Sequence, residues 1–138
     1  MITKDQIISI VFKACPSFKG VYDSSDNQDL LYVVMGDLAD HLLSLYKENK
    51  TEEFNELSKV IEAMHIDGDG YVKELATIGF LESIQNVWSN NGVDPKKFTK
   101  YLRPESKKWW DELNDFWKGK ISSVGEGLHN KTINPTRR

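Results

Sequence analysis

Apolar residues recur at intervals of three and four positions along most of residues 1–118, which is the spacing of one face of an α-helix. No segment alternates apolar and polar residues with the period of two that a half-buried strand requires. The pattern therefore predicts an all-α fold of five to six helices in antiparallel hairpins, arranged as a bundle or as a short HEAT-like stack. The segments with helical spacing are residues 3–14, 29–49, 51–64, 71–90, 95–102 and 104–118.

Residues typical of helix ends stand at several of these boundaries. Thr3 and Gln6 have the spacing of a capping box, in which each side chain satisfies the backbone N–H of the other residue. Asp94 is followed by proline, a combination typical of the start of a helix. The intervening residues 17–27 and 65–70 are rich in glycine and polar side chains. We therefore predict that these two segments are loops.

The helical spacing ends near residue 119. Glycine, serine, asparagine and proline dominate residues 120–138, and such a composition buries too little apolar surface to fold alone. We predict a single helical domain over residues 1–119 and a flexible or loosely docked C-terminal tail over residues 120–138.

Charge is distributed unevenly along the chain. Residues 1–94 contain 16 acidic and 7 basic side chains, a net charge of −9, whereas residues 95–138 contain 5 acidic and 11 basic side chains, a net charge of +6. The overall charge of −3 argues against a dedicated nucleic-acid-binding protein. Two interpretations remain open. The basic part neutralises the acidic body by folding against it, or the acidic body presents a surface to a basic partner.

The beginning of the chain and its cysteine content bear on its location. The first residues lack the positively charged region of a signal peptide, and the apolar runs are too short to span a membrane. Cys15 is the single cysteine, which excludes a disulfide within the chain and fits a reducing compartment. We therefore expect a cytoplasmic protein that contacts no membrane.

Two motifs invite a metal-binding interpretation. The run from Asp67 to Gly70 reads Asp-Gly-Asp-Gly between two predicted helices, but no register supplies both the ligands and the glycine of a calcium-binding EF-hand loop. Glu62 and His65 share one helical face, but a di-iron carboxylate site needs a second such pair and two further glutamates. We therefore expect no bound metal and no other cofactor.

Motifs of known catalytic sites do not occur in the sequence. It contains no glycine-flanked serine elbow, no P-loop and no dinucleotide-binding fingerprint. Cys15 is interpreted as a core residue. We expect no catalytic residues and a protein that is not an enzyme. The alternative is a small metal-dependent or hydrolytic enzyme that uses His41, His65 and nearby carboxylates.

Four large aromatic rings gather in the last predicted helix, at Trp109, Trp110, Phe116 and Trp117. The lysines beside them resemble a basic–aromatic surface for nucleic acid, but the acidic remainder of the chain would repel a polyanion. We therefore interpret the rings as core residues and expect no direct contact with nucleic acid.

Several fragments of the sequence are those of a known family. They are Leu30–Tyr32, Gly36–Leu38, His65–Asp69, Tyr71–Glu74, Ala76–Glu82, Ile84–Asn86 and Tyr101–Trp110. Through them the sequence resembles, over most of residues 6–118, a family of small all-helical bacterial proteins of unassigned function. The resemblance implies no particular activity. By analogy, small acidic helical proteins of this kind are similar to the immunity proteins of polymorphic toxin and contact-dependent inhibition systems.

This analogy and the acidic body together predict a binding protein. We expect a bacterial immunity protein that neutralises a cognate basic toxin, a nuclease in our hypothesis, by occluding its active site with an acidic surface. A small-molecule ligand is not expected. The second and fourth predicted helices would join the acidic groups into one surface if they pack side by side. The predicted partner-binding residues are Asp23, Asp26, Asp29, Tyr32, Asp37, Asp40, His65, Asp67, Asp69, Tyr71 and Glu74.

Overall fold

The computed structural model describes residues 1–117, and these residues contain helices and no strand. The all-α prediction is confirmed. The predicted tail at residues 120–138 lies outside the described residues. The elements are η1 (Lys4–Gln6), α1 (Ile7–Ala14), α2 (Phe18–Asp23), α3 (Leu31–Lys47), α4 (Phe54–Asp67), α5 (Gly70–Glu74), η2 (Leu75–Leu81), α6 (Glu82–Asn90), η3 (Pro95–Tyr101) and α7 (Pro104–Trp117).

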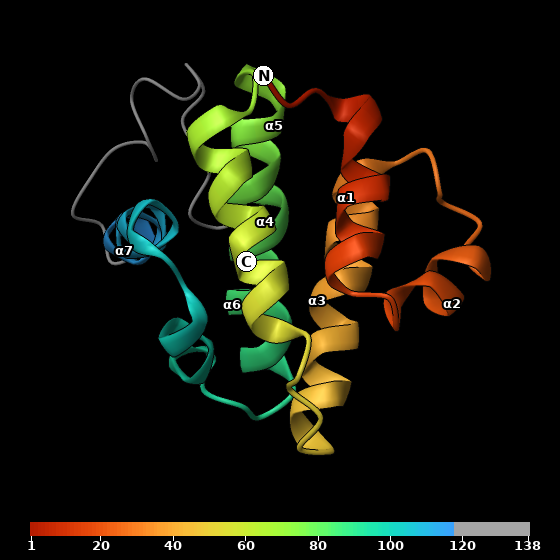
Figure 1. The fold of residues 1–138 in the computed structure, drawn as a ribbon. Coiled ribbons are helices and arrows are strands. Elements are labelled where there is room, and N and C mark those ends of the chain that lie inside the picture. Colours follow the sequence, from red (N-terminus) through yellow and green to blue (C-terminus); the bar gives the residue numbers. More distant parts are fainter. Residues whose placement is uncertain (118–138) are drawn as a thin grey trace.

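The helices are arranged around one long central helix. α5, η2 and α6 follow one another without a break from Gly70 to Asn90. α3 packs along η2 and α6, and α4 packs against α5 and η2. α1 lies against α4, α2 lies against α3, and α7 crosses the other helices so that Figure 1 shows it nearly end-on. The fold is therefore a bundle in which the central helix is covered on several sides.

The middle of the central helix, η2, is a π-helix, a wider form with hydrogen bonds from residue i to i+5. Its seven residues carry no charge, and all except Ile78 are buried. A helix that is apolar on every side has to be enclosed by other elements, and α3, α4 and α7 enclose this one. Gly79 lets α3 come close, because a Cβ at this position would lie 3.3 Å from Cγ of Met35.

Aromatic side chains fill the part of the core around η3. The Phe98 ring of η3 contacts Phe54, Phe80 and Trp88, and the Trp88 indole also donates a hydrogen bond to the Ala39 carbonyl of α3 (3.2 Å). Buried aromatic rings contribute large apolar areas, and a buried indole N–H needs a partner such as this carbonyl. On α7 the residues Trp110, Leu113 and Phe116 are buried as well. The prediction that the aromatic residues of the last helix belong to the core is confirmed for Trp110 and Phe116.

The predictions of loops at residues 17–27 and 65–70 are each wrong in part. Residues 18–23 form α2 within the predicted loop 17–27, because the buried Phe18 anchors this turn of helix against the core. α4 continues to Asp67 through the beginning of the predicted loop 65–70, and the chain then turns within Gly68 and Asp69. Two predicted caps are present. Gln6 Oε1 accepts from the backbone N–H of Thr3 (2.9 Å), and Asp94 Oδ1 accepts from the backbone N–H of Lys96 (3.0 Å).

None of the helices in residues 1–117 combines the length and the apolar character needed to cross a lipid bilayer.

Candidate functional site

His65 of α4 lies at the centre of a buried cluster of polar side chains. Its Nδ1 is 3.0 Å from the Ser106 hydroxyl of α7, and its Nε2 is 2.8 Å from the Thr77 hydroxyl of η2. The single proton of the Ser106 hydroxyl goes to Glu62 Oε1 (2.9 Å). Ser106 therefore accepts a hydrogen bond from Nδ1–H of His65, and Nε2 accepts one from Thr77. Burial lowers the pKa of His65 to about 4, so the ring is neutral at pH 7.

Glu62 holds the N-terminus of α7. Its Oε2 accepts from the backbone N–H of Glu105 (2.9 Å) and its Oε1 from that of Ser106 (2.8 Å). Burial alone would raise the pKa of Glu62, but these backbone bonds and the Ser106 hydroxyl outweigh it and lower the pKa. The first turn of a helix has free N–H groups and a positive partial charge, both of which favour a carboxylate. Glu62 and His65 thus join α4 to η2 and α7.

The cluster corrects one expectation about partner binding. His65 is 5% exposed, so it lies beneath the molecular surface and is not available as an anchor for a partner. Glu62 and His65 also fail to supply a metal site, because their polar atoms already engage Ser106, Thr77 and Glu105. In residues 1–117 no group of three or more metal-ligating side chains is found.

A second cluster of the same residue types joins α2, α3 and α4. The Ser17 hydroxyl donates to Glu53 Oε1 (2.7 Å), and His41 Nε2 is 2.8 Å from the same hydroxyl. The backbone N–H of Ser17, just before α2, also donates to Glu53 (3.3 Å). Because the hydroxyl proton goes to Glu53, His41 Nε2 has to carry a proton of its own and donate to Ser17.

This arrangement of Ser17, His41 and Glu53 differs from the catalytic triad of a serine hydrolase. In a catalytic triad the histidine takes the proton of the serine and the carboxylate orients the histidine, whereas here the carboxylate binds the serine directly. Burial lowers the pKa of His41, although Glu53 and Asp40 oppose that shift. Burial, followed by the hydrogen bond with Glu53, raises the pKa of the Cys15 thiol to about 12, so Cys15 is not a nucleophile at neutral pH. The cluster closes the start of α2 onto α4.

The outer face of α3 combines apolar and acidic side chains. Leu30, Val33, Asp37 and Asp40 are spaced by three and four residues, so they follow one side of the helix. Leu30 is 50% exposed and Val33 is 42% exposed, which is unusual for side chains of this size. Partial burial and the neighbouring charge of Asp40 raise the pKa of Asp37. Two carboxylates that repel each other in this way are favourable partners for a cation.

Two tyrosines connect this face with α5. The hydroxyl of Tyr32 donates to Glu74 at 2.5 Å, and the Tyr32 ring meets the Tyr71 ring edge-on with 6.0 Å between the centroids. Tyr71 remains 41% exposed. α3 therefore lies beside the helix that carries Tyr71 and Glu74, which is the condition under which these groups were predicted to share a surface. We call Leu30, Val33, Asp37, Asp40, Tyr32, Tyr71 and Glu74 the α3–α5 surface.

The remaining acidic residues that were predicted to bind a partner either lie in an exposed connection or have interaction partners of their own. Asp23 ends α2 and pairs with Lys19 (2.7 Å), and both Asp26 and Asp29 lie in the exposed connection to α3. Asp69 caps α5 by accepting from the backbone N–H of Val72 (2.9 Å). The Asp67 carboxylate is 3.9 Å from the N-terminal amine. These hydrogen bonds and ion pairs involve no residue of the α3–α5 surface.

Comparison with known proteins places the chain in a family. The profile described as "Domain of unknown function (DUF7674)" matches residues 8–118. The chain belongs to the DUF7674 family. No curated protein and no solved structure matches the chain in the same comparisons.

The DUF7674 match extends from α1 to the end of α7 and so contains both polar clusters and all of the α3–α5 surface. The resemblance to a family of unassigned function is confirmed. Sequence patterns of this DUF7674 chain could not reveal the Ser17 and Ser106 contacts, since each serine meets a glutamate more than thirty residues away. The Glu62 and His65 pair was the one visible signal, and its spacing is shared by metal sites and structural clusters.

Proposed function

We propose that this DUF7674 protein is a bacterial immunity protein that neutralises a basic protein toxin of the nuclease class by covering its active site. The observation that carries the proposal is the α3–α5 surface. Exposed Leu30 and Val33 share one side of α3 with Asp37 and Asp40, and Tyr32 joins α3 to exposed Tyr71 and to Glu74 of α5. Large exposed apolar side chains rimmed by charge are typical of protein-binding sites.

The charge of the surface favours a basic partner. Nuclease clefts carry positive charge because they hold phosphates, and residues 1–94 of this chain have a net charge of −9. Carboxylates aimed at such a cleft accelerate association and exclude the nucleic-acid substrate. Tyr71 and the two aliphatic side chains would supply the desolvated centre of the interface, which stabilises the complex once it has formed.

The test reverses two charges of the α3–α5 surface. The partner is captured from the native lysate at low salt with the tagged full-length chain, and inhibition of its nuclease activity is then titrated with each variant. We expect Asp37→Lys with Asp40→Lys to weaken inhibition by about tenfold or more, mainly through slower association. Asp69 and Glu74 are left unchanged, because both have structural partners whose loss would confuse the result.

The matched control is Asp5→Lys with Glu52→Lys, which changes the net charge equally at exposed positions outside this surface. It should inhibit nearly as well as the natural sequence at physiological salt, where distant charges are screened. Equal inhibition by the two double variants would contradict the proposed surface. A captured partner without nuclease activity would contradict the proposed class of toxin.

A further inference from the structure

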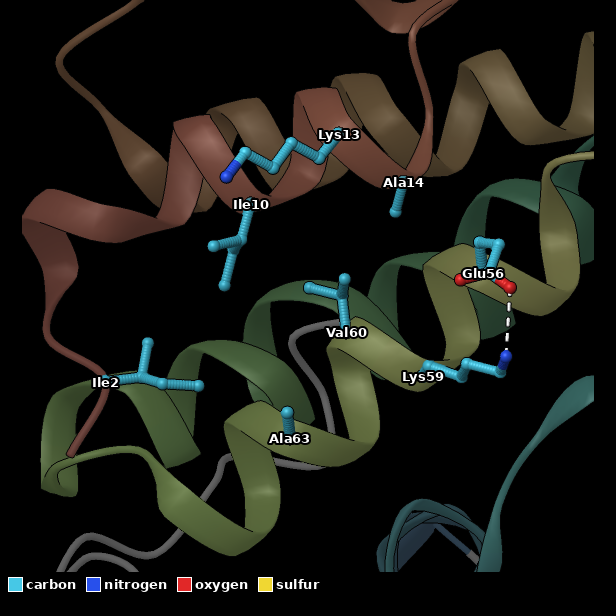
Figure 2. A pocket seen from close by; sticks show the side chains of 8 residues that line it. All are labelled: Ile2, Ile10, Lys13, Ala14, Glu56, Lys59, Val60 and Ala63. Atoms are coloured by element: carbon cyan, nitrogen blue, oxygen red, sulfur yellow. Dashed lines mark hydrogen bonds and ion pairs between the residues drawn. The ribbon is translucent and has the colours of Figure 1, made fainter.

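A pocket of about 330 Å³ opens between α1 and α4, away from the residues of the α3–α5 surface. Figure 2 shows Ile10 of α1 and Val60 of α4 pointing into the space between the two helices. The small side chains of Ala14 and Ala63, one from each helix, leave this space unfilled. The wall is therefore mainly aliphatic.

The pocket is bounded at both ends. Ile2 stands at one end, where its backbone N–H donates to the Asp67 carbonyl (2.8 Å) and its carbonyl accepts from Asp69 N–H (3.0 Å). The ion pair between Glu56 and Lys59 (2.9 Å) stands at the other end (Figure 2). The pocket is open to solvent, and its volume of about 330 Å³ lies in the range of small-molecule sites.

The charges at the pocket select the kind of small molecule. Lys13 lines it with an ammonium group that has no ion pair or hydrogen bond within residues 1–117. Lys59 offers a second cation, which Glu56 balances. The pocket therefore has an excess positive charge in a part of the chain that is acidic overall. A buried aliphatic body with an anionic head would match both the walls and Lys13.

We propose that the α1–α4 pocket binds a medium-chain carboxylate, with the aliphatic chain between Ile10 and Val60 and the carboxylate on Lys13. The modest volume of about 330 Å³ is the reason for choosing a medium-chain ligand over a long-chain one. Pockets of this size lie at the lower end of the range for small-molecule sites. The inference is independent of the proposed immunity function, because it concerns other residues.

The experiment titrates sodium decanoate into the full-length protein below its micelle concentration and follows binding by calorimetry. We expect one bound decanoate per chain and no binding of decyltrimethylammonium, which has the same chain with a cationic head. Lys13→Glu should weaken decanoate binding by about tenfold, the effect of losing one charged partner. Lys4→Glu, an exposed charge change that does not line the pocket, should leave the affinity within about twofold.

A second variant distinguishes binding in the pocket from binding to other lysines on the surface. Val60→Trp fills the space without changing charge, and its fold is checked by circular dichroism. Val60→Trp should abolish decanoate binding and keep the helical signal. If Val60→Trp loses the helical signal, Ala63→Leu replaces it as a variant that fills less of the pocket. Absence of decanoate binding to the natural sequence, equal affinity for the cationic amphiphile, or unchanged affinity in both filled variants would overturn the proposal.

Discussion

Replacing Gly68 with alanine is expected to destabilise the protein by about 3 kcal/mol or more. The backbone at Gly68 has φ −76° and ψ 156°, which any residue adopts, so the cost comes from space. A Cβ there would lie 2.4 Å from the Met64 carbonyl oxygen and 2.5 Å from Cγ1 of Val72. The carbonyl accepts the hydrogen bond that ends α4, and Val72 is fully buried, so neither atom can move without disturbing the turn.

Urea unfolding followed by circular dichroism measures this effect. Gly20→Ala is the matched control, because a Cβ at Gly20 meets nothing within 4 Å and the residue lies inside α2. Alanine is the better helix former there, so Gly20→Ala should raise the free energy of unfolding by about 0.5–1 kcal/mol. A free energy of unfolding for Gly68→Ala within 0.5 kcal/mol (on the order of experimental error) of the natural sequence would show that the turn adapts.

Acidification from pH 7 to about pH 4 is expected to remove about 3 kcal/mol of stability through His65 alone. The folded-state pKa of His65 is lowered to about 4 by burial, whereas the unfolded chain has an ordinary value near 6.5. Between these two values the unfolded state binds a proton that the folded state does not bind. The contribution of His65 to stability is therefore complete above pH 6.5, falls as the pH decreases through this window, and stops falling below about pH 4.

The measurement compares the free energy of unfolding at several pH values in the natural sequence and in His65→Asn. Asparagine keeps a donor and an acceptor for Ser106 and Thr77 but does not titrate. The variant should be less stable at pH 7 and should lose much of the pH dependence between 6.5 and 4. His41→Asn is the comparison variant. The pKa of His41 is also lowered, but His41 is less buried than His65, so this variant should lose less of the pH dependence than His65→Asn. The same pH dependence in His65→Asn and the natural sequence would show that other groups govern acid unfolding.

Much of the fold could be predicted from the sequence because its long helices carry clear apolar stripes. The stripe through Leu38, Leu42 and Leu45 belongs to a helix with one face on the core and one in water, so its period is visible. η2 lies within the predicted helix 71–90, but the helical spacing there does not reveal that every residue of η2 except Ile78 is buried. The uncharged run from Leu75 to Leu81 was the available sign of this burial. The sequence did not predict α2, because this short helix is stabilised by the burial of Phe18 in the core and not by a local pattern of residues.

The candidate site was predictable only where local helix geometry determines it. Tyr32, Tyr71 and Glu74 were named as candidates for one surface if their helices pack side by side, and the structure brings them into contact. His65 was expected at the surface, but α7 covers it with Ser106, which is 41 residues further along the chain. The α1–α4 pocket was equally invisible, because it depends on small residues of two helices facing each other.

The π-helix in the central helix also affects how the length of this chain can vary. A turn closed from residue i to i+5 contains one residue more than an α-helical turn. Loss of one residue within Leu75–Leu81 could therefore be absorbed by closing ordinary turns, with the helices on either side still facing their neighbours. The same loss within α3 would rotate every later residue of that helix by about 100° and turn its apolar stripe out of the core. Ile78 is the one residue of η2 that is not buried, so we expect its deletion to disturb the packing of this chain less than deletion of any other residue of η2.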